Sequence, residues 1–454
     1  IYLSGDFYED MDADPGPDVS MIYAEGGISI FIISLDSAGK FRWARSIPDA
    51  GTGLIDAMAV DKSGNVYLSD QYKSGADMDP GPGVTILDSL FNVGNYLLKM
   101  DANGDFIWCK TIGQSKRFEP YLTVITRCLH AAPDESIYFT CSYMGDTLDL
   151  DPGAGVYQVT GTSDDYNGAL VKINPNGDLL WACHTNSIGN YKAVTTDLNG
   201  NVYAVGDFED WMDFDPGKGV FKLDAGYRSD SFLQKLDAEG NLIWVKNTGI
   251  DIIFNTTFLS TDMDKGVWIA GNFFNNIYCI NEGQKIVLSS IGDQDIFVQY
   301  IDKQGNVKLL KNIGSAATDA IESMATDLEG NLYVSGRVDG LADIDFGGTY
   351  HTIDSNSPAL FVGQWRPGQK IESKPLPLIL TPNPTSGLLT LDLNAPPQDV
   401  RINIWNATGQ FMSSRVYHDA ALFQFELEGN PGLYFVQVVL EDGTTVVEKV
   451  VKGL

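Results

Sequence analysis

Residues 61–69 read Asp-Lys-Ser-Gly-Asn-Val-Tyr-Leu-Ser, a tight turn that leads into a short apolar strand, and the chain repeats this phrase. Its aromatic residue returns at spacings of 65, 71, 65, 65 and 65 residues. The recurring positions are Tyr2, Tyr67, Tyr138, Tyr203, Trp268 and Tyr333. Self-similarity at a fixed period indicates one supersecondary unit that is stacked several times, because a single unit cannot bury its apolar face alone.

Each unit holds four short apolar runs, which in the second unit are residues 56–61, 66–69, 96–101 and 105–112. They are rich in β-branched and aromatic residues and are bounded by Asp, Asn, Gly or Ser, a pattern typical of strands. Asp-x-x-Gly turns join the first run to the second and the third to the fourth, so each unit is predicted to be a four-stranded antiparallel meander.

Units of four short strands predict an all-β fold, a β-propeller of about six four-stranded blades over residues 1–365. A tryptophan in the fourth run keeps the same period as the aromatic residue of the second. It occurs at Trp43, Trp108, Trp181 and Trp244, with Leu309 in the next unit. Because the chain opens at Ile1 inside a second strand, we expect the first blade to lack its innermost strand, and a strand and an export signal to precede Ile1.

The connection between the second and third strands is enlarged and carries paired aspartates before Pro-Gly. The pairs are Asp12 and Asp14, Asp77 and Asp79, Asp149 and Asp151, and Asp213 and Asp215. One interpretation is that the second Asp caps the Pro-Gly turn through backbone N–H groups while the first is solvated. The alternative is a calcium site, because two carboxylates that point the same way suit a hard cation.

Composition changes after Trp365. Closely spaced Pro and Gly predict a linker over residues 366–377. Residues 378–454 lose the repeat, and their alternating apolar pattern predicts a small antiparallel β-sandwich.

Four segments of this last region resemble the type A C-terminal sorting domain of the type IX secretion system of Bacteroidota. They are Pro-Asn-Pro-Thr-Ser-Gly at 382–387, Ile-Asn-Ile-Trp-Asn-Ala-Thr-Gly-Gln at 402–410, Pro-Gly-Leu-Tyr-Phe-Val at 431–436 and Glu-Lys-Val-Val-Lys at 448–452. The motif residues are Pro382, Asn383, Pro384, Gly387, Gly409, Gly432, Tyr434 and Lys449. The resemblance implies the type IX machinery as a partner and an extracellular or outer-membrane surface location. Residues 1–365 resemble SBBP-type bacterial propeller repeats, a likeness that implies no activity.

The charge of the chain restricts its partners. A net charge of −30 and a pI near 4.3 argue against nucleic acid or anionic lipid. No apolar run has the length of a membrane helix. Five cysteines do not make a disulfide scaffold. Cys128 and Cys141 could face each other across a hairpin, so a disulfide bond between these two cysteines is left open.

No catalytic constellation is evident. The four histidines are scattered without metal-ligand spacing, and His130, near Arg127 on an innermost strand, is the nearest to one. We therefore expect no catalytic residues, no cofactor other than calcium, and a binding protein in preference to an enzyme. The leading hypothesis is a secreted or cell-surface module that binds a glycan or a protein through its blade loops. A hydrolase or lyase at the propeller mouth and a passive surface spacer are the alternatives.

Overall fold

The computed structural model contains no helix among the residues that it describes. These are residues 1–24, 27–47, 56–87, 93–113, 123–144, 147–161, 165–185, 187–217, 219–226, 229–248, 257–262, 266–281, 284–327, 329–344, 352–365, 379–382, 384–393, 398–406, 411–440 and 445–453. Two compact units are present. The first holds residues 1–290, 294–312 and 320–330, and the second holds residues 291–293, 313–319 and 331–454.

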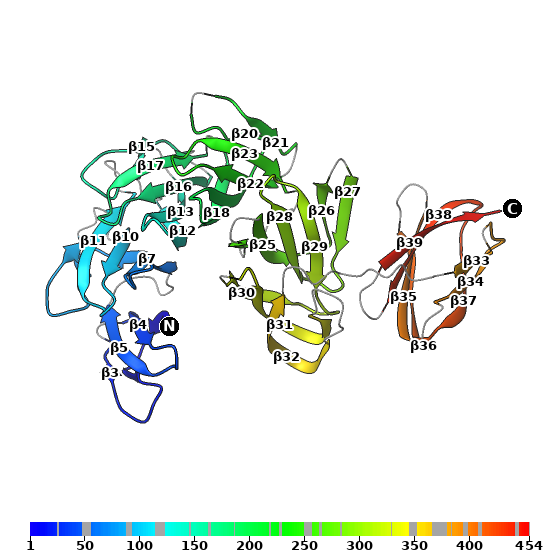
Figure 1. The fold of residues 1–454 in the computed structure, drawn as a ribbon, viewed down its shortest axis with the longest axis horizontal. Helices are drawn as coiled ribbons and strands as arrows, with labels where there is room; N and C mark the ends of the chain where they lie inside the picture. The colour runs from blue at the N-terminus through cyan, green and yellow to red at the C-terminus, as the bar shows by residue number, and fades with distance from the viewer. Residues whose placement is uncertain are drawn as a thin grey trace. The chain divides into compact units, whose positions relative to one another are not determined.

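Four of the sheets formed by the described residues contain four antiparallel strands each, in the order of an up-and-down meander. They are β6 (Ala57–Val60), β7 (Val66–Lys73), β10 (Val93–Met100) and β11 (Phe106–Ile112); β12 (Thr123–Ala131), β13 (Ile137–Met144), β16 (Asn167–Ile173) and β17 (Leu179–His184); β18 (Gly189–Thr196), β19 (Val202–Phe208), β22 (Asp230–Leu236) and β23 (Leu242–Asn247); and β24 (Thr257–Asp262), β25 (Gly266–Phe273), β28 (Asp295–Asp302) and β29 (Val307–Ile313). Figure 1 shows these blades following one another in sequence order through the first unit. The expected propeller blades are confirmed.

The first and last sheets of the repeat region have three strands each. The first consists of β1 (Tyr2–Phe7), β4 (Ser29–Leu35) and β5 (Phe41–Ile47), in that order. The last consists of β30 (Ala320–Thr326), β31 (Leu332–Asp343) and β32 (Thr352–Trp365). β1 contains Tyr2 and therefore corresponds to the second strand of a complete blade, as expected.

The repeated aromatic residues join each blade to the next. Tyr67 on β7 packs edge-on against Trp108 on β11, with 6.1 Å between ring centroids. Trp108 Nε1 donates a hydrogen bond to the carbonyl oxygen of Pro175, in the turn between β16 and β17 of the following blade, at 3.1 Å. The same indole bond runs from Trp43 to Ala102, from Trp181 to Ala238 and from Trp244 to Lys303. The 65-residue period is therefore the period of a blade interface.

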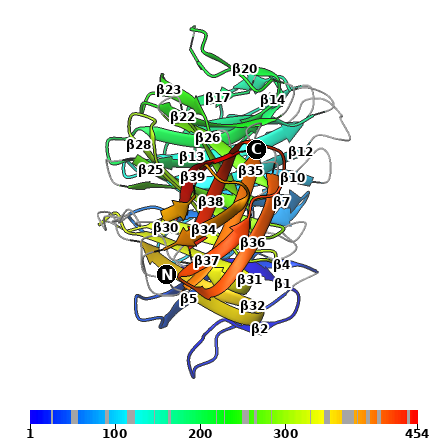
Figure 2. The same cartoon turned by 90° about the vertical axis from the view of Figure 1, so that its right-hand side faces the viewer.

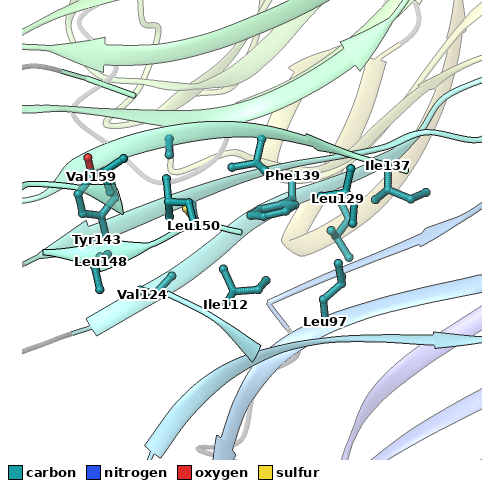
Figure 3. Packing of buried hydrophobic residues seen from close by; sticks show 14 of the residues in the cluster. Leu97, Ile112, Val124, Leu129, Ile137, Phe139, Tyr143, Leu148, Leu150 and Val159 are labelled. Carbon is teal, nitrogen blue, oxygen red and sulfur yellow. The ribbon is translucent and has the colours of Figure 1, made fainter. Parts of the chain in front are cut away.

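Apolar side chains fill the space between neighbouring blades. Leu97 and Ile112 of one blade meet Leu129 and Phe139 of the next in a continuous cluster (Figure 3). Full burial of each such side chain contributes about 1.5–3 kcal/mol. Stacking of neighbours therefore supplies the core that one sheet lacks.

The glycine of the Asp-x-x-Gly turn has two separate constraints. Gly104 has φ +77°, a left-handed conformation that glycine adopts without strain. A Cβ at Gly104 would also lie 2.8 Å from the ring of Trp43 in the preceding blade. The turn residue therefore serves the hairpin and the blade interface together.

Cys128 and Cys141 do not form a disulfide, and both are free thiols. A bulge between Thr126 and Cys128 shifts the register, so that Cys141 lies opposite Thr126 and Cys128 lies opposite Thr140. Cys141 is buried against the preceding blade. Cys128 instead packs against the apolar clusters between the third and fourth blades and between the fourth and fifth. The bond that the sequence left open is absent because the two side chains leave the sheet on different faces.

The C-terminal region forms the expected sandwich of a three-stranded and a four-stranded antiparallel sheet. The strands are β33 (Ile379–Thr381), β34 (Leu388–Asp392) and β37 (Leu422–Glu426) in one sheet and β36 (Phe411–Ala420), β35 (Gln398–Asn406), β38 (Gly432–Leu440) and β39 (Thr445–Lys452) in the other. Figure 2 shows the four strands of the larger sheet side by side. Residues 366–378, which include the expected linker, lie outside the described residues.

Among the described residues, no helix is long and apolar enough to cross a membrane.

Candidate functional site

The paired aspartates lie on small hairpins that extend the connection between the second and third strands of a blade. Each hairpin is a separate two-stranded sheet. The strands are β2 (Met11–Asp12) with β3 (Met21–Ile22), β8 (Ala76–Asp77) with β9 (Ile86–Leu87), β14 (Leu148–Asp149) with β15 (Gln158–Val159), and β20 (Trp211–Asp213) with β21 (Lys222–Asp224). The fifth blade has a hairpin of β26 (Asn276–Asn281) and β27 (Gln284–Ser289) without the Asp-Pro-Gly sequence. We call these five elements the satellite hairpins.

The first aspartate of each pair ties the two ends of the loop together. Asp77 Oδ1 accepts hydrogen bonds from the backbone N–H of Asp79 at 3.1 Å and of Thr85 at 2.8 Å. The same two bonds run to Asp12 from Asp14 and Ser20, to Asp149 from Asp151 and Tyr157, and to Asp213 from Asp215 and Phe221. The expectation that the first aspartate is merely solvated is wrong, because its carboxylate accepts two backbone hydrogen bonds. The sequence did not indicate the second of them, whose donor lies eight residues farther along the loop.

The second aspartate caps the Pro-Gly turn as expected. Asp79 Oδ1 accepts a hydrogen bond from the N–H of Gly81 at 2.8 Å. The equivalent bonds join Asp14 to Gly16, Asp151 to Gly153 and Asp215 to Gly217. The other oxygen, Asp79 Oδ2, would lie 2.1 Å from a Cβ at Gly83, so the side chain fills the concave side of the loop.

The hydrogen bonds bear on whether calcium fits these loops. The Oδ1 atom of each aspartate is already engaged by backbone donors, and calcium prefers six to eight oxygen ligands. No group of three or more His, Cys, Asp or Glu side chains that could hold a metal ion occurs within the described part of the chain. Turn capping accounts for the geometry, and calcium at these pairs stays a prediction.

Two substitutions of Asp77, by asparagine and by alanine, distinguish turn capping from calcium binding. Asn can still accept both backbone bonds, so Asp77→Asn should change stability little, whereas Asp77→Ala should cost about 1–3 kcal/mol. Melting curves of both variants, with millimolar calcium and with EDTA, measure this. If calcium raised the melting temperature and Asp77→Asn lost one site's share of the rise, about 2.7 kcal/mol at a hundredfold excess over Kd, the metal site would be established.

In the four satellite hairpins with paired aspartates, one apolar residue is buried and another is exposed to solvent. The residue between the paired aspartates is buried in all four loops: Ala13, Met78, Leu150 and Phe214. A valine five positions after the second aspartate is exposed in all four: Val19 by 72%, Val84 by 74%, Val156 by 61% and Val220 by 69%. The buried residue and the aspartate bonds therefore hold an exposed apolar side chain in the same place on each of four blades.

Large aromatic side chains are exposed on two of these hairpins. Tyr8 and Tyr23 flank the first and are 68% and 56% exposed. Trp211 on β20 is 50% exposed, and Lys222 Nζ lies 3.8 Å from the centroid of its ring. Tyr and Trp side chains are enriched at binding interfaces, because they combine a large apolar ring with a polar group.

The innermost strands carry a different set of polar groups. His130 Nε2 on β12 accepts a hydrogen bond from the backbone N–H of Thr196 at 3.2 Å and lies 2.8 Å from Thr196 Oγ1. Burial lowers the pKa of His130 to about 4, so the imidazole is neutral at pH 7 with its Nε2 lone pair engaged. Arg127 is not brought to His130 by any described contact, and its Nε donates to Ser142 Oγ at 3.1 Å.

A series of hydroxyl bonds continues from His130 across the innermost strands. Thr261 Oγ1 donates to the carbonyl oxygen of Thr196 at 2.9 Å, and Thr326 Oγ1 donates to that of Thr261 at 2.8 Å. These threonines are about one repeat apart in sequence, but their contact was not predicted. The recurrent Thr-Asp at the end of the innermost strand was the available signal.

The sorting-domain motif is held against the end of the chain. Lys452 Nζ donates to the carbonyl oxygens of Leu427 at 2.7 Å and Gly429 at 2.9 Å. Thr385 N–H donates to Val451 O at 2.8 Å, and Gly453 N–H donates to Thr385 O at 2.8 Å. Thr385 and Lys452 were in the quoted segments but were not singled out as motif residues.

The motif residues themselves divide into several groups. Tyr434 is buried and its hydroxyl donates to Asn430 O at 2.7 Å. Gly387 is buried with φ +138°, and Gly432 begins β38. Pro382 and Pro384 are exposed. Asn383, Gly409 and the side chain of Lys449 lie outside the described residues.

Comparison with known proteins identifies the C-terminal region. Residues 380–453 match the secretion system C-terminal sorting domain. This domain indicates secretion by the type IX system, to the extracellular space or the cell surface.

The repeat region is similar to a WD repeat protein. The match is to an uncharacterized WD repeat-containing protein of Acanthamoeba polyphaga mimivirus, at 22% identity over 387 residues. It covers 71% of this chain and 27% of the relative, so the chain spans about a quarter of that protein's length. WD repeats build β-propellers, which agrees with the blades observed here.

Proposed function

We propose that this protein is an exported propeller that binds a glycan or a protein through its satellite hairpins. The observation that carries the proposal is the exposed valine held at the same place on four successive blades, with Tyr8, Tyr23 and Trp211 exposed on the same kind of loop. Apolar side chains that the core does not need, on hairpins rigidified by their own carboxylates, are suited to recognition.

Rigidity is the physical reason that favours binding over a spacer. Each loop is closed by three side-chain to backbone bonds, as at Asp77 and Asp79, so little conformational entropy is left to lose when a ligand docks. The loops belong to repeats that we interpret as SBBP-type, and the sorting domain would deliver them to the cell surface. The acidic surface favours neutral or cationic ligands over anionic ones.

The enzyme alternative has less support in the described residues. A hydrolase or lyase would need a base with a free lone pair at the channel, and His130 Nε2 already accepts the Thr196 N–H. The spacer alternative predicts that the exposed side chains of the hairpins can be removed without any effect on binding.

A binding assay with matched variants tests the proposal. Purified full-length chain is applied to a glycan array and, labelled, to whole bacteria measured by flow cytometry. A Tyr8→Ala, Tyr23→Ala, Trp211→Ala triple variant should bind about tenfold or more weakly, the effect of losing aromatic anchors. Leu198→Ala is the control, because Leu198 is 55% exposed on a turn at the opposite end of its blade. Equal binding of all three proteins, or none by any, would contradict the proposal.

A further inference from the structure

The fourth strand of one blade places a cation over the turn between the third and fourth strands of the next blade. Arg45 on β5 lies 3.2 Å from the carboxylate of Asp105, and Lys110 on β11 lies 3.4 Å from that of Asp178. Each of these aspartates directly follows the glycine of its turn. At the first two blade interfaces a carboxylate of the turn therefore neutralises the cation of the preceding blade.

The next two interfaces differ from the first two. Between the third and fourth blades both charges are replaced together, because Cys183 stands at the position of the cation and Asn241 at that of the carboxylate. Between the fourth and fifth blades Lys246 is retained, and Asn306 takes the place of the aspartate. Lys246 therefore lacks the counter-charge that its position has at the first two interfaces.

Lys246 keeps the geometry of a paired cation. Its Cε would lie 2.9 Å from a Cβ at Gly305, and Lys110 Cε would lie 2.9 Å from a Cβ at Gly177. Lys246 is exposed, and among the described residues it has no ion-pair partner. Its ammonium group is thus open to a carboxylate from outside the chain.

Two further lysines distinguish this turn from those of the three preceding blades. Lys303 directly follows Asp302, and Lys308 lies on β29. The preceding blades have Ala102, Pro175 and Ala238 at the first of these positions and Ile107, Leu180 and Ile243 at the second. Asp302 Oδ2 lies 3.2 Å from Lys308 Nζ and accepts a hydrogen bond from Asn306 at 3.1 Å. Lys246 and residues 302–308, which we call the lysine turn, thus set three lysines against one carboxylate.

Lys303 lies close to the fourth blade. Trp244 Nε1, two residues before Lys246, donates a hydrogen bond to the carbonyl oxygen of Lys303 at 3.2 Å. Burial lowers the pKa of Lys235 on β22, Asp197 opposes this change, and the charge of Lys303 adds to it. The positive charge of the lysine turn therefore reaches the neighbouring blade.

We infer that the lysine turn binds an acidic polypeptide segment of another molecule, whose carboxylate occupies the place that Asp105 and Asp178 hold at the first two interfaces. Those two aspartates are carried on polypeptide turns, so a peptide carboxylate is the group that this place accommodates. Lys303 and Lys308 provide positive charge for a second carboxylate of the same segment.

The lysine turn is separate from the satellite hairpins. Those hairpins extend the connection between the second and third strands of a blade, whereas the lysine turn joins the third strand to the fourth. Successive connections of an up-and-down meander lie at opposite ends of the sheet. A segment bound at the lysine turn therefore leaves the satellite hairpins free.

Electrostatics sets the conditions for binding. The net charge of −30 repels an acidic segment, but charges more than about 8 Å away are largely screened at physiological ionic strength. A single exposed ion pair contributes little, so several lysines must act together. The complex should weaken as the salt concentration rises.

Replacement of the missing carboxylate tests the inference. The full-length chain is titrated with a fluorescein-labelled oligo-aspartate peptide, and binding is followed by fluorescence anisotropy at low and at physiological salt. Asn306→Asp should weaken binding about tenfold or more, because it supplies Lys246 with an internal partner. The second blade already carries Asp101 and Asp105 in this arrangement, so the turn can hold two carboxylates.

Asn241→Asp is the matched control. It makes the same change of charge at the same repeat position, but there Cys183 stands in place of the cation. Peptide binding by this variant should equal that of the unaltered chain. Equal binding by Asn306→Asp and Asn241→Asp, or no peptide binding by the unaltered chain at low salt, would overturn the inference.

Removal of the lysines is the complementary test. A Lys246→Gln, Lys303→Gln double variant should lose most of its peptide binding. A Lys40→Gln, Lys62→Gln double variant has the same net charge and should retain it, since Lys40 and Lys62 are exposed on other blades. A similar loss in both double variants would mean that net charge alone governs binding, and the inference would fail.

Two competitors identify the ligand class and the site. If dextran sulfate or polygalacturonate bound the lysine turn and the peptide did not, the ligand would be an acidic polysaccharide and the inference would be wrong. The Tyr8→Ala, Tyr23→Ala, Trp211→Ala variant should bind the peptide normally whether or not the satellite hairpins recognise a ligand. Loss of peptide binding in that variant would place the peptide on the satellite hairpins and contradict the inference.

Discussion

Asp70→Asn is expected to stabilise the protein at pH 8 by about 3–5 kcal/mol and to leave its stability at pH 4 almost unchanged. Asp70 is buried on β7, and its Oδ2 accepts no hydrogen bond from the described residues. Four of the other five repeats carry glycine at this position: Gly5, Gly206, Gly271 and Gly336. A buried carboxyl group at this position is therefore specific to the second blade and is not needed by the repeat.

The sign follows from the raised pKa. Burial and the neighbouring Asp56 and Asp6 raise the pKa of Asp70 to about 8, whereas the unfolded chain releases this proton near pH 4. From pH 4 to pH 8 the unfolded state thus holds fewer protons than the folded state, and stability falls as the pH rises. Below pH 4 both states are protonated and the penalty disappears.

Calorimetry of the two proteins at pH 4, 6 and 8 measures the effect. A gain of this size should raise the melting temperature by about 5 °C at pH 8 for a unit of several hundred residues. Asp61→Asn is the matched control, because Asp61 is also buried but accepts hydrogen bonds from Ser63, Asn65 and Tyr67. That variant should not be stabilised. A pH-independent effect of Asp70→Asn, or a loss of stability at pH 8, would refute the assignment.

Removal of residues 378–454 is expected to abolish export and to leave the propeller folded in the periplasm. Residues 380–453 match the sorting domain, and its core of Leu389, Ile402 and Val436 is a separate apolar cluster. The measurement is the amount of chain at the cell surface and in the medium, compared with the periplasm, together with a melting curve of the truncated protein.

A single substitution tests the sorting role without removing the whole domain. Lys452→Met should impair export, because Lys452 Nζ joins the last strand to the carbonyls of Leu427 and Gly429. Glu428→Gln is the control, since Glu428 is exposed and pairs with Arg415 on the surface. Normal surface display of the truncated chain would refute the sorting role.

Local features of the fold were predictable from the sequence. The Asp-x-x-Gly turns, the strand positions and the spacing of Tyr67 and Trp108 depend on residues close together in the chain, and the repeat multiplies each signal. The second aspartate of each pair was also assigned correctly as a cap, because its donor is two residues away.

Features that depend on residues far apart in the sequence were not predictable. The bond from Asp77 to Thr85 spans eight residues around a loop whose path the sequence does not specify. A single-residue bulge at Arg127 was enough to separate Cys128 from Cys141. Neither could be derived from residue types and spacing.

The sequence by itself determined the repeat, the all-β blades and the sorting domain, because turn chemistry, alternation of apolar residues and motif order act over short distances. Only the tertiary structure decided which groups meet between blades, as the indole of Trp108 meets the carbonyl oxygen of Pro175, and which carboxylates are buried near one another, as Asp70 is near Asp56. Burial removes the water that would otherwise solvate such groups, so their charges and hydrogen bonds depend on the neighbours that the fold brings to them.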